Sequence, residues 1–297
     1  MSDQPPLFEL PEPPAPGWRP SDLGDGTQVH WTSSAEMGSR LDATYYVITR
    51  RPERLLDTLT CPLSPLEEWA AVNPAERRLP VERGYLLYDH CLYAQIRDVR
   101  DGCWLLGPGP ALSPVLSRVE GLSKGLAVKE VRDLPARATF QLQPGDLLLP
   151  RVYSSLHKAV LVLETEMPLV ASSAFALLQP RSRLHGLALL ALLHHRVLGE
   201  QLWALASGTT VRAVSAGKVH TLQIPQIAPG LQSALAARVE ELLHAQAMVY
   251  FPGLRVPVME YWQDGTLSQW RRRAQTLAQE VQKMIDQALG VEARSTS

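Results

Sequence analysis

The sequence predicts an α+β fold, in which a mixed sheet with interspersed helices is followed by long helices of the coiled-coil type. Short stretches rich in β-branched and aromatic residues recur between residues 85 and 178, without the regular strand–helix alternation of a parallel sheet. Over the last third of the chain, apolar residues recur at helical spacing. With 297 residues, 45% of them hydrophobic and 20% charged, the chain has the composition of an ordinary globular protein with a sizeable core.

Residues 1–38 are expected to form a proline- and acid-rich tail. Residues 1–30 hold seven prolines, and five acidic residues against one arginine give this stretch a net charge of −4. Proline cannot continue a helix or donate to a sheet ladder, so a disordered tail is the expectation. The tail lacks a basic stretch followed by an apolar one, and secretion is therefore not expected.

The next region is expected to mix short helices and strands. Residues 52–58 and the apolar positions of 66–72 indicate two short helices. Residues 85–88, 92–96 and 104–106 have the β-branched and aromatic content of strands. The last of these is closed by the turn-forming Gly-Pro-Gly-Pro sequence that follows.

Further strands and a long helix are expected up to residue 206. The alternating or apolar stretches that indicate strands are 127–131, 138–142, 147–149, 159–163 and 174–178. The segment 184–206 is strongly apolar and contains no proline, so its length predicts one helix. Strands with interspersed helices and no strand–helix–strand repeat predict an α+β domain.

Residues 230–297 are expected to form a helical region. A first helix is indicated at 231–248, and a second by a heptad seam over three heptads. The seam consists of Leu267, Trp270, Ala274, Leu277, Val281, Met284 and Ala288. Thr266 begins this helix with a capping box to Gln269, and Gly290 follows its end. The seam requires a partner, which is either 231–248 of the same chain or a second protein.

Charge and motifs exclude several function classes. The net charge of −1 gives no support for nucleic-acid binding over the whole chain, but residues 151–223 hold seven basic residues against three acidic ones, a net charge of +4. The three cysteines form neither a disulfide framework nor a zinc pattern, and no apolar run is long enough to span a membrane, so a cytoplasmic protein is expected. His194-His195 is expected in mid-helix without a matching metal ligand. Phosphate-binding, nucleophile-elbow and zinc-protease motifs are missing, and no catalytic activity is predicted.

Four motifs, in this order, resemble those of the specificity subunits of type I restriction-modification systems. The "RLDATYY" of 40–46 is followed about a hundred residues later by the "GDLL" of 145–148. The "GTT" of 208–210 and the Ile-Pro pair at 224–225 then precede the amphipathic helix. The resemblance covers about 39–250 and implies that 39–229 is a DNA target-recognition domain. Family members carry two such domains, whereas this chain has one.

The basic and short polar residues near strand ends are the candidate DNA contacts under this resemblance, since such loops present donors to phosphates and base edges. These candidates are Arg151, Ser154, Lys158, Arg181, Arg183, Thr209, Thr210, Arg212 and Lys218. Each is also compatible with an ordinary solvated surface.

The resemblance implies a non-catalytic subunit that brings an adenine-N6 methyltransferase to double-stranded DNA. S-adenosylmethionine is expected on that partner methyltransferase, and no cofactor or metal is expected on this chain. A restriction motor subunit is an optional further partner. The helical region is expected to dock the partner subunits and to form a homodimer, and a homodimer would read a palindromic site in two halves.

Two alternatives stay open. In the first, the chain is a non-methylating adaptor that binds DNA or protein in a phage-defence complex. In the second, it is an enzyme whose site gathers Asp89, His90 and His157. An apolar pocket that holds these three residues would favour the enzyme.

Overall fold

The protein is described here from a computed structural model of residues 1–297. The structure describes residues 56–57, 59–80, 86, 88–107, 126–207, 212–251 and 266–290. All of them belong to one compact unit, Arg51–Ser297. The predicted tail of 1–38, the "RLDATYY" motif and most of the predicted helix at 52–58 lie outside the described residues.

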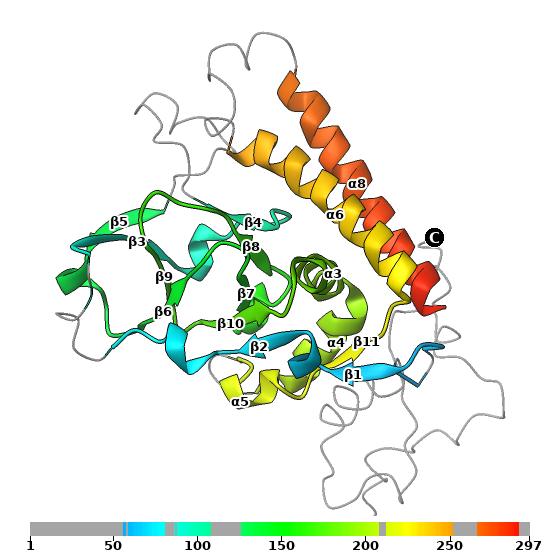
Figure 1. The fold of residues 1–297 in the computed structure, drawn as a ribbon, viewed down its shortest axis with the longest axis horizontal. Helices are drawn as coiled ribbons and strands as arrows, with labels where there is room; N and C mark the ends of the chain where they lie inside the picture. Colours follow the sequence, from blue (N-terminus) through cyan, green and yellow to red (C-terminus); the bar gives the residue numbers. More distant parts are fainter. Residues whose placement is uncertain are drawn as a thin grey trace, which may run out of the picture. The chain divides into compact units, whose positions relative to one another are not determined.

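A five-stranded mixed sheet, here called the central sheet, organises the described residues (Figure 1). Its strands are β2 (Ala70–Val72), β4 (Leu105–Leu106), β7 (Leu147–Pro150), β8 (Val160–Val162) and β10 (Phe175–Pro180). Their order is β2-β10-β7-β8-β4, with a parallel β4–β8 pair and antiparallel pairs elsewhere.

A four-stranded sheet packs on one face of the central sheet. Its strands are β3 (His90–Ala94), β5 (Ala127–Glu130), β6 (Ala138–Leu142) and β9 (Leu169–Ser172). They are ordered β5-β3-β9-β6, and β3–β9 is the parallel pair. A short antiparallel pair, β1 (Leu63–Pro65) with β11 (Gln223–Pro225), completes the strands of the described residues.

Helices cover the other face of the central sheet. They are α3 (Arg183–Leu193), α4 (Arg196–Leu205), α5 (Ala216–Val219), α6 (Pro229–Tyr250) and α8 (Thr266–Leu289). Within the described ranges, every helix is too short or too polar to cross a bilayer. The predicted α+β fold with a mixed sheet and long C-terminal helices is confirmed.

The leucine run of β7 shows why the central sheet is covered on both faces. Successive strand residues point to opposite sides. Leu147 and Leu149 join the core with α3 and α6, whereas Leu148 joins the core between the two sheets. All three side chains are fully buried. A continuous apolar run, rather than an alternating one, is what such a strand requires.

The turn before β7 explains the "GDLL" motif. Gly145 has a φ of +91°, a conformation that side chains rarely allow. Asp146 Oδ2 accepts a hydrogen bond from the Gln143 main-chain N at 2.7 Å, and Asp146 Oδ1 lies 3.5 Å from Arg77 Nη2. Burial raises the pKa of Asp146. In this structure the motif therefore builds a turn and a core strand.

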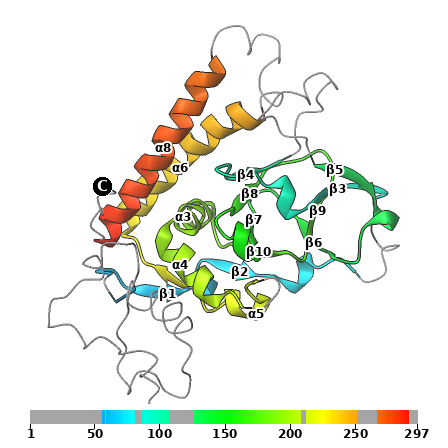
Figure 2. The same ribbon diagram turned by 180° about the vertical axis from the view of Figure 1, so that it is seen from behind.

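The helices α6 and α8 pack side by side as an antiparallel pair, here called the helical hairpin (Figures 1 and 2). The buried line along α8 is Ala274, Leu277, Val281, Ile285 and Leu289. The predicted seam is thus correct at its centre, and at its end Ile285 and Leu289 are fully buried while the predicted Met284 and Ala288 are partly buried against the same core. A straight α-helix drifts from a strict heptad by about 20° per repeat, which accounts for this shift. Gly290 follows α8 with a φ of +65°, as predicted for the residue after the helix.

Buried polar side chains join the hairpin to the sheets. Gln246 of α6 accepts a hydrogen bond from the Trp104 main-chain N at 2.8 Å and donates one to the Gly102 carbonyl at 2.8 Å. His195 Nε2 lies 3.2 Å from Asp286 Oδ1 of α8. The hairpin is therefore held to the sheets by specific hydrogen bonds as well as by apolar packing.

The continuous helix predicted at 184–206 is wrong, because α3 ends at Leu193 with His194 as its C-cap, and α4 begins at Arg196 with His195 as its N-cap. His195 is extended, and its Nδ1 accepts a hydrogen bond from the Val197 main-chain N at 3.3 Å. A histidine thus caps α4, in the position where Ser, Thr, Asp or Asn is usual. His194-His195 therefore lies at a helix junction and not in mid-helix.

Further segments differ from the prediction, among them β1, which was not predicted. The helix expected at 66–72 is a 3₁₀ turn at Leu66–Glu68 followed by β2, which pairs with β10. The strand β9 and the short helix α5 were not predicted. At residues 66–72, the pairing of β2 with the distant strand β10 overrides the local apolar spacing.

Candidate nucleic-acid interface

Two segments far apart in the sequence meet beyond the end of β7. Isolated β-bridges join Val152 to Ala213 and Ser207 to Ala213. The Tyr153 main-chain N donates to the Arg212 carbonyl at 2.9 Å. The structure thus brings the predicted contacts Arg151, Ser154 and Arg212 into one region, because they belong to these paired segments.

At this meeting point the Arg212 guanidinium lies against two aromatic rings. Its Cζ is 4.9 Å from the Tyr153 ring centroid and 5.6 Å from that of Trp203, which lies on α4. Trp203 Nε1 donates a hydrogen bond to the Tyr153 hydroxyl. The two distances from Arg212 Cζ to the ring centroids are within the range of cation–π interaction. We call Tyr153, Trp203 and Arg212 the Arg212 cluster.

The charge of the Arg212 cluster is not neutralised within the described residues. Arg212 Nη2 donates to the Ala206 carbonyl at 3.2 Å, and no described carboxylate pairs with this guanidinium. Tyr153 keeps 37% of its surface exposed, so the cluster reaches the molecular surface. A positive, partly apolar surface of this kind suits phosphates and base edges.

Arg151 lies beside the cluster but is bound by the protein itself. Its guanidinium donates to the carbonyl of Ser173, and through Nη1 to the carbonyl of Val214 at 3.4 Å. The side chain is half-buried, and burial lowers the pKa of the guanidinium. In this structure Arg151 ties the β9–β10 turn to the segment after Arg212.

Four other candidates lie around or next to this region in the sequence. Ser154 is exposed on the 3₁₀ turn Tyr153–Ser155, and Lys218 is exposed on α5. Thr209 and Thr210 lie outside the described residues.

Arg181 is exposed, but two of its donors are used. Its Nε and Nη2 bind the Glu67 carbonyl at 2.9 and 2.7 Å. The Glu67 carboxylate in turn lies 2.9 Å from His220 Nδ1, just after α5. Arg181 therefore lies near the α5 segment that carries Lys218.

Lys158 and Arg183 are apart from the Arg212 cluster and have carboxylate partners. Lys158 Nζ lies 2.7 Å from Asp101 Oδ1, and hydrogen bonds from Lys158 and His157 lower the pKa of Asp101. Arg183 Nε lies 2.9 Å from Glu240 Oε1 of α6. Both basic groups are thus paired within the chain, and Arg183 is paired with the hairpin.

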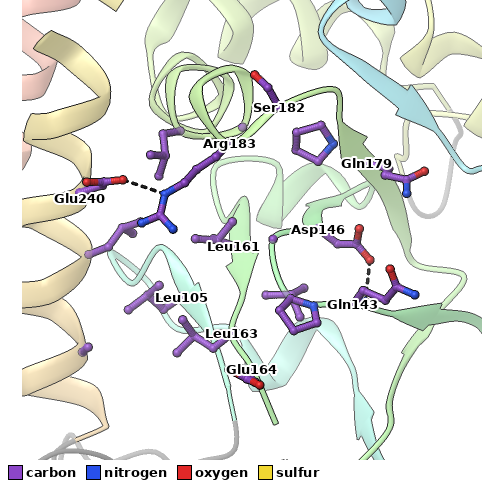
Figure 3. A pocket seen from close by; sticks show the side chains of 18 of the residues that line it. Leu105, Gln143, Asp146, Leu161, Leu163, Glu164, Gln179, Ser182, Arg183 and Glu240 are labelled. Atoms are coloured by element: carbon purple, nitrogen blue, oxygen red, sulfur yellow. Dashed lines mark hydrogen bonds and ion pairs between the residues drawn. The ribbon is translucent and has the colours of Figure 1, made fainter. Parts of the chain in front are cut away.

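The Arg183–Glu240 pair lines a cavity of about 640 Å³ between the central sheet and α6 (Figure 3). Asp146 and Gln143 form its opposite wall. The residues of the enzyme alternative, Asp89, His90 and His157, do not line it. Among the described residues, no three His, Cys, Asp or Glu side chains are grouped so that they could hold a metal ion.

Sequence reasoning identified Arg212 but missed Trp203, one of the two aromatic residues that its guanidinium contacts. Trp203 follows Leu202, which is fully buried, on α4. A tryptophan one position beyond a buried helical stripe lies at the edge of that stripe and is partly exposed. That position was the available signal, but it does not say which side chain the ring contacts.

The chain is partly similar to three solved structures. It is 16% identical to the HsdS subunit from Thermoanaerobacter tengcongensis, with a TM-score of 0.43 over 66% of this chain and 51% of that one. A structure from a type I R-M system is 14% identical, with a TM-score of 0.40 over 83% and 53%. The type IIG restriction endonuclease BpuSI is 15% identical, with a TM-score of 0.28 over 51% and 17%.

The chain therefore spans about half the length of the first two of these proteins. Both belong to the type I systems that the sequence motifs resemble. No protein-family model matches the chain, and no curated protein matches it in sequence.

Proposed function

We propose that this chain is a sequence-specific DNA-recognition subunit that directs an adenine-N6 methyltransferase to its target. The sheets and the Arg212 cluster bind DNA, and the helical hairpin holds the partner methyltransferase. That partner carries S-adenosylmethionine and flips the target base out of the duplex to reach it. This chain contributes the choice of site.

The observation that carries the proposal is the partly exposed Arg212 guanidinium, which pairs with no carboxylate of the described residues. It lies within a segment of net charge +4, and Ser154 and Lys218 are exposed on neighbouring segments. The sequence Gly-Thr-Thr-Val of 208–211 precedes it directly. Basic side chains and small hydroxyl residues are the groups that contact phosphates in protein–DNA complexes.

The hairpin supports the second half of the proposal. Gln246 of α6 is bonded to Trp104, just before β4, and Asp286 of α8 lies beside His195, the N-cap residue of α4. A partner bound to the hairpin would therefore keep a defined position relative to the Arg212 cluster. The central apolar residues of the predicted seam are buried within the chain. A homodimer through these helices stays a prediction, and it would use other faces of the hairpin.

The proposal is tested by mapping modified bases in the host genome with the gene intact, deleted, and restored from a plasmid. We expect one adenine-methylated motif to vanish on deletion and to return with the restored gene. Identical maps in all three strains would contradict the methylation role. A lost phage resistance with identical maps would favour the adaptor alternative instead.

A further inference from the structure

We propose that Tyr153 and Trp203 position Arg212, so that its guanidinium binds two neighbouring acceptor atoms of DNA in a fixed plane. This inference rests on the proposed function and names the side chains that give the site its geometry. Tyr153 and Trp203 are positioning residues, and Arg212 makes the contact.

Three separate parts of the chain hold the guanidinium. Tyr153 comes from the turn after β7, Trp203 from α4, and the Ala206 carbonyl from the residue after α4. The hydrogen bond from Trp203 to the Tyr153 hydroxyl fixes the two rings relative to each other. The ring centroids are 6.2 Å apart, with a tilt of 44° between the planes. The guanidinium therefore lies against two rings that are themselves fixed relative to each other.

A guanidinium has five N–H donors in a rigid planar fork. Within the described residues, the Ala206 carbonyl accepts from Nη2 of Arg212. The second N–H of Nη2 and the N–H groups of Nε and Nη1 therefore remain for a ligand, and Nη2 can form a fork with one of these two neighbours. A fork of this kind fits two adjacent acceptors, which DNA offers as two oxygens of one phosphate or as O6 and N7 of guanine.

Fixing the plane matters for this kind of contact. A free arginine side chain loses rotamer freedom when it binds, and a preorganised one has already lost it. Lys218, which is exposed on α5, offers a flexible point charge instead. The two residues are thus suited to different contacts, a directional one at Arg212 and a diffuse one at Lys218.

The test uses the purified full-length chain and a pool of duplex DNA with a randomised central segment. Bound duplexes are selected and sequenced, and the wild type and variants are then titrated with the selected duplex and with a scrambled one at several salt concentrations. Arg212→Lys keeps the charge but removes the planar fork. Trp203→Ala removes one ring, and Trp203→Phe restores an aromatic face.

We expect Arg212→Lys to bind the selected duplex about tenfold more weakly, while its salt dependence stays close to that of the wild type. Trp203→Ala should show a loss of similar size, and Trp203→Phe should recover part of it. A loss confined to the selected duplex would identify a guanine edge. An equal loss on both duplexes would identify a phosphate.

Two matched controls separate positioning from general damage. Arg132→Lys changes an exposed arginine that pairs with Glu130 next to β5, and Trp270→Ala changes a partly exposed tryptophan of α8. Both should bind like the wild type. Thermal unfolding of each variant shows whether it is folded, and Trp203→Phe keeps the test valid if Trp203→Ala is not.

Two results would overturn different statements. If the wild type enriches a sequence but Arg212→Lys and folded Trp203→Ala bind it equally well, the positioning inference is wrong and the proposed function stands. If the wild type enriches no sequence from the pool, the proposed DNA recognition fails, and the inference fails with it.

Discussion

Arg151 and Arg212 belong to segments that pair with each other, yet their guanidinium groups have opposite surroundings. Arg151 is half-buried and donates to two main-chain carbonyls, Ser173 and Val214. Arg212 is partly exposed and lies against two aromatic rings, and no described carboxylate pairs with it. One arginine therefore stabilises the fold, and the other is available to a ligand.

Basic residues on the side of the helical hairpin also differ from Arg212, because they have partners within the chain. There, Lys158 and Arg183 are paired with Asp101 and Glu240. In the fold, the basic residues of 151–223 thus fall into three groups: those that stabilise the fold, those that are paired with carboxylates, and those that are available to a ligand. Partners, and not charge alone, decide which basic residues can bind DNA.

The comparison of the two arginines predicts the largest difference in stability. Arg151→Ala leaves two carbonyls without their charged donor and should lower the free energy of unfolding by about 3 kcal/mol. Arg212→Ala removes mainly exposed cation–π contacts and should lower it by about 1 kcal/mol at most. Urea unfolding of both variants measures this difference. Equal losses would mean that Arg151 has no special structural role.

The helix junction on the hairpin side predicts a loss of stability in acid. Burial lowers the pKa of His194 to about 4, and its Nε2 lies 2.7 Å from the Ala159 carbonyl. The unfolded chain, with a histidine pKa of about 6.5, then binds a proton that the folded chain does not. The contribution of His194 to the free energy of unfolding should therefore be complete above pH 6.5. It should fall by up to about 1.4 kcal/mol per pH unit toward pH 4.

This pH effect is checked by urea unfolding of the wild type and of His194→Gln between pH 7 and pH 4.5. Burial also lowers the pKa of His195, although Asp286 opposes the shift. Replacing His194 should therefore flatten the pH dependence without removing it. Parallel curves for the two proteins would show that His194 has the same pKa in the folded protein as in the unfolded chain.

The attachment of the hairpin predicts a smaller effect. Gln246→Leu leaves the Trp104 N–H and the Gly102 carbonyl without partners inside the protein and should cost about 2 kcal/mol. Gln275→Leu changes an exposed glutamine of α8 and is the matched control. Thermal unfolding of both variants measures the difference. A Gln246→Leu protein as stable as the control would mean that these hydrogen bonds do not fix the hairpin.

The smallest expected effect concerns the paired arginine of the hairpin side. Arg183 is 83% exposed in its side chain and bound to Glu240, so Arg183→Ala should change stability by less than about 0.5 kcal/mol. Its effect on DNA affinity should also be smaller than that of Arg212→Ala. If Arg212 binds a phosphate, Arg212→Ala should reduce the slope of log affinity against log salt by about 0.9. Salt titrations of both variants measure these changes. If Arg183→Ala weakened DNA binding more than Arg212→Ala, the DNA interface would lie on the side of the helical hairpin.

Much of the fold follows from local patterns in the sequence. The apolar run at 147–149 and the heptad positions Ala274, Leu277 and Val281 are buried as predicted. These predictions succeed because burial periodicity is a local property. The break at His194-His195 could not be predicted in this way, because it depends on a histidine side chain acting as a helix cap.

The candidate site was predictable only in part. Arg212 could be named from its position after a glycine-containing loop, but its aromatic partners come from segments about 60 and 10 residues away in the sequence. Arg151 has the same residue type and a similar position after a strand. Its binding to Ser173 and Val214 depends on tertiary contacts that no local pattern encodes.

Ultraviolet crosslinking of the full-length chain to the selected duplex, followed by mass spectrometry of the crosslinked peptides, tests the central claim most directly. Aromatic side chains next to bases or sugars react without a linker, so the crosslinks mark the surface that contacts DNA. We predict crosslinks in the peptides that contain Tyr153, Trp203 and residues 208–212. Crosslinks confined to α6 and α8, with none at the Arg212 cluster, would contradict this account.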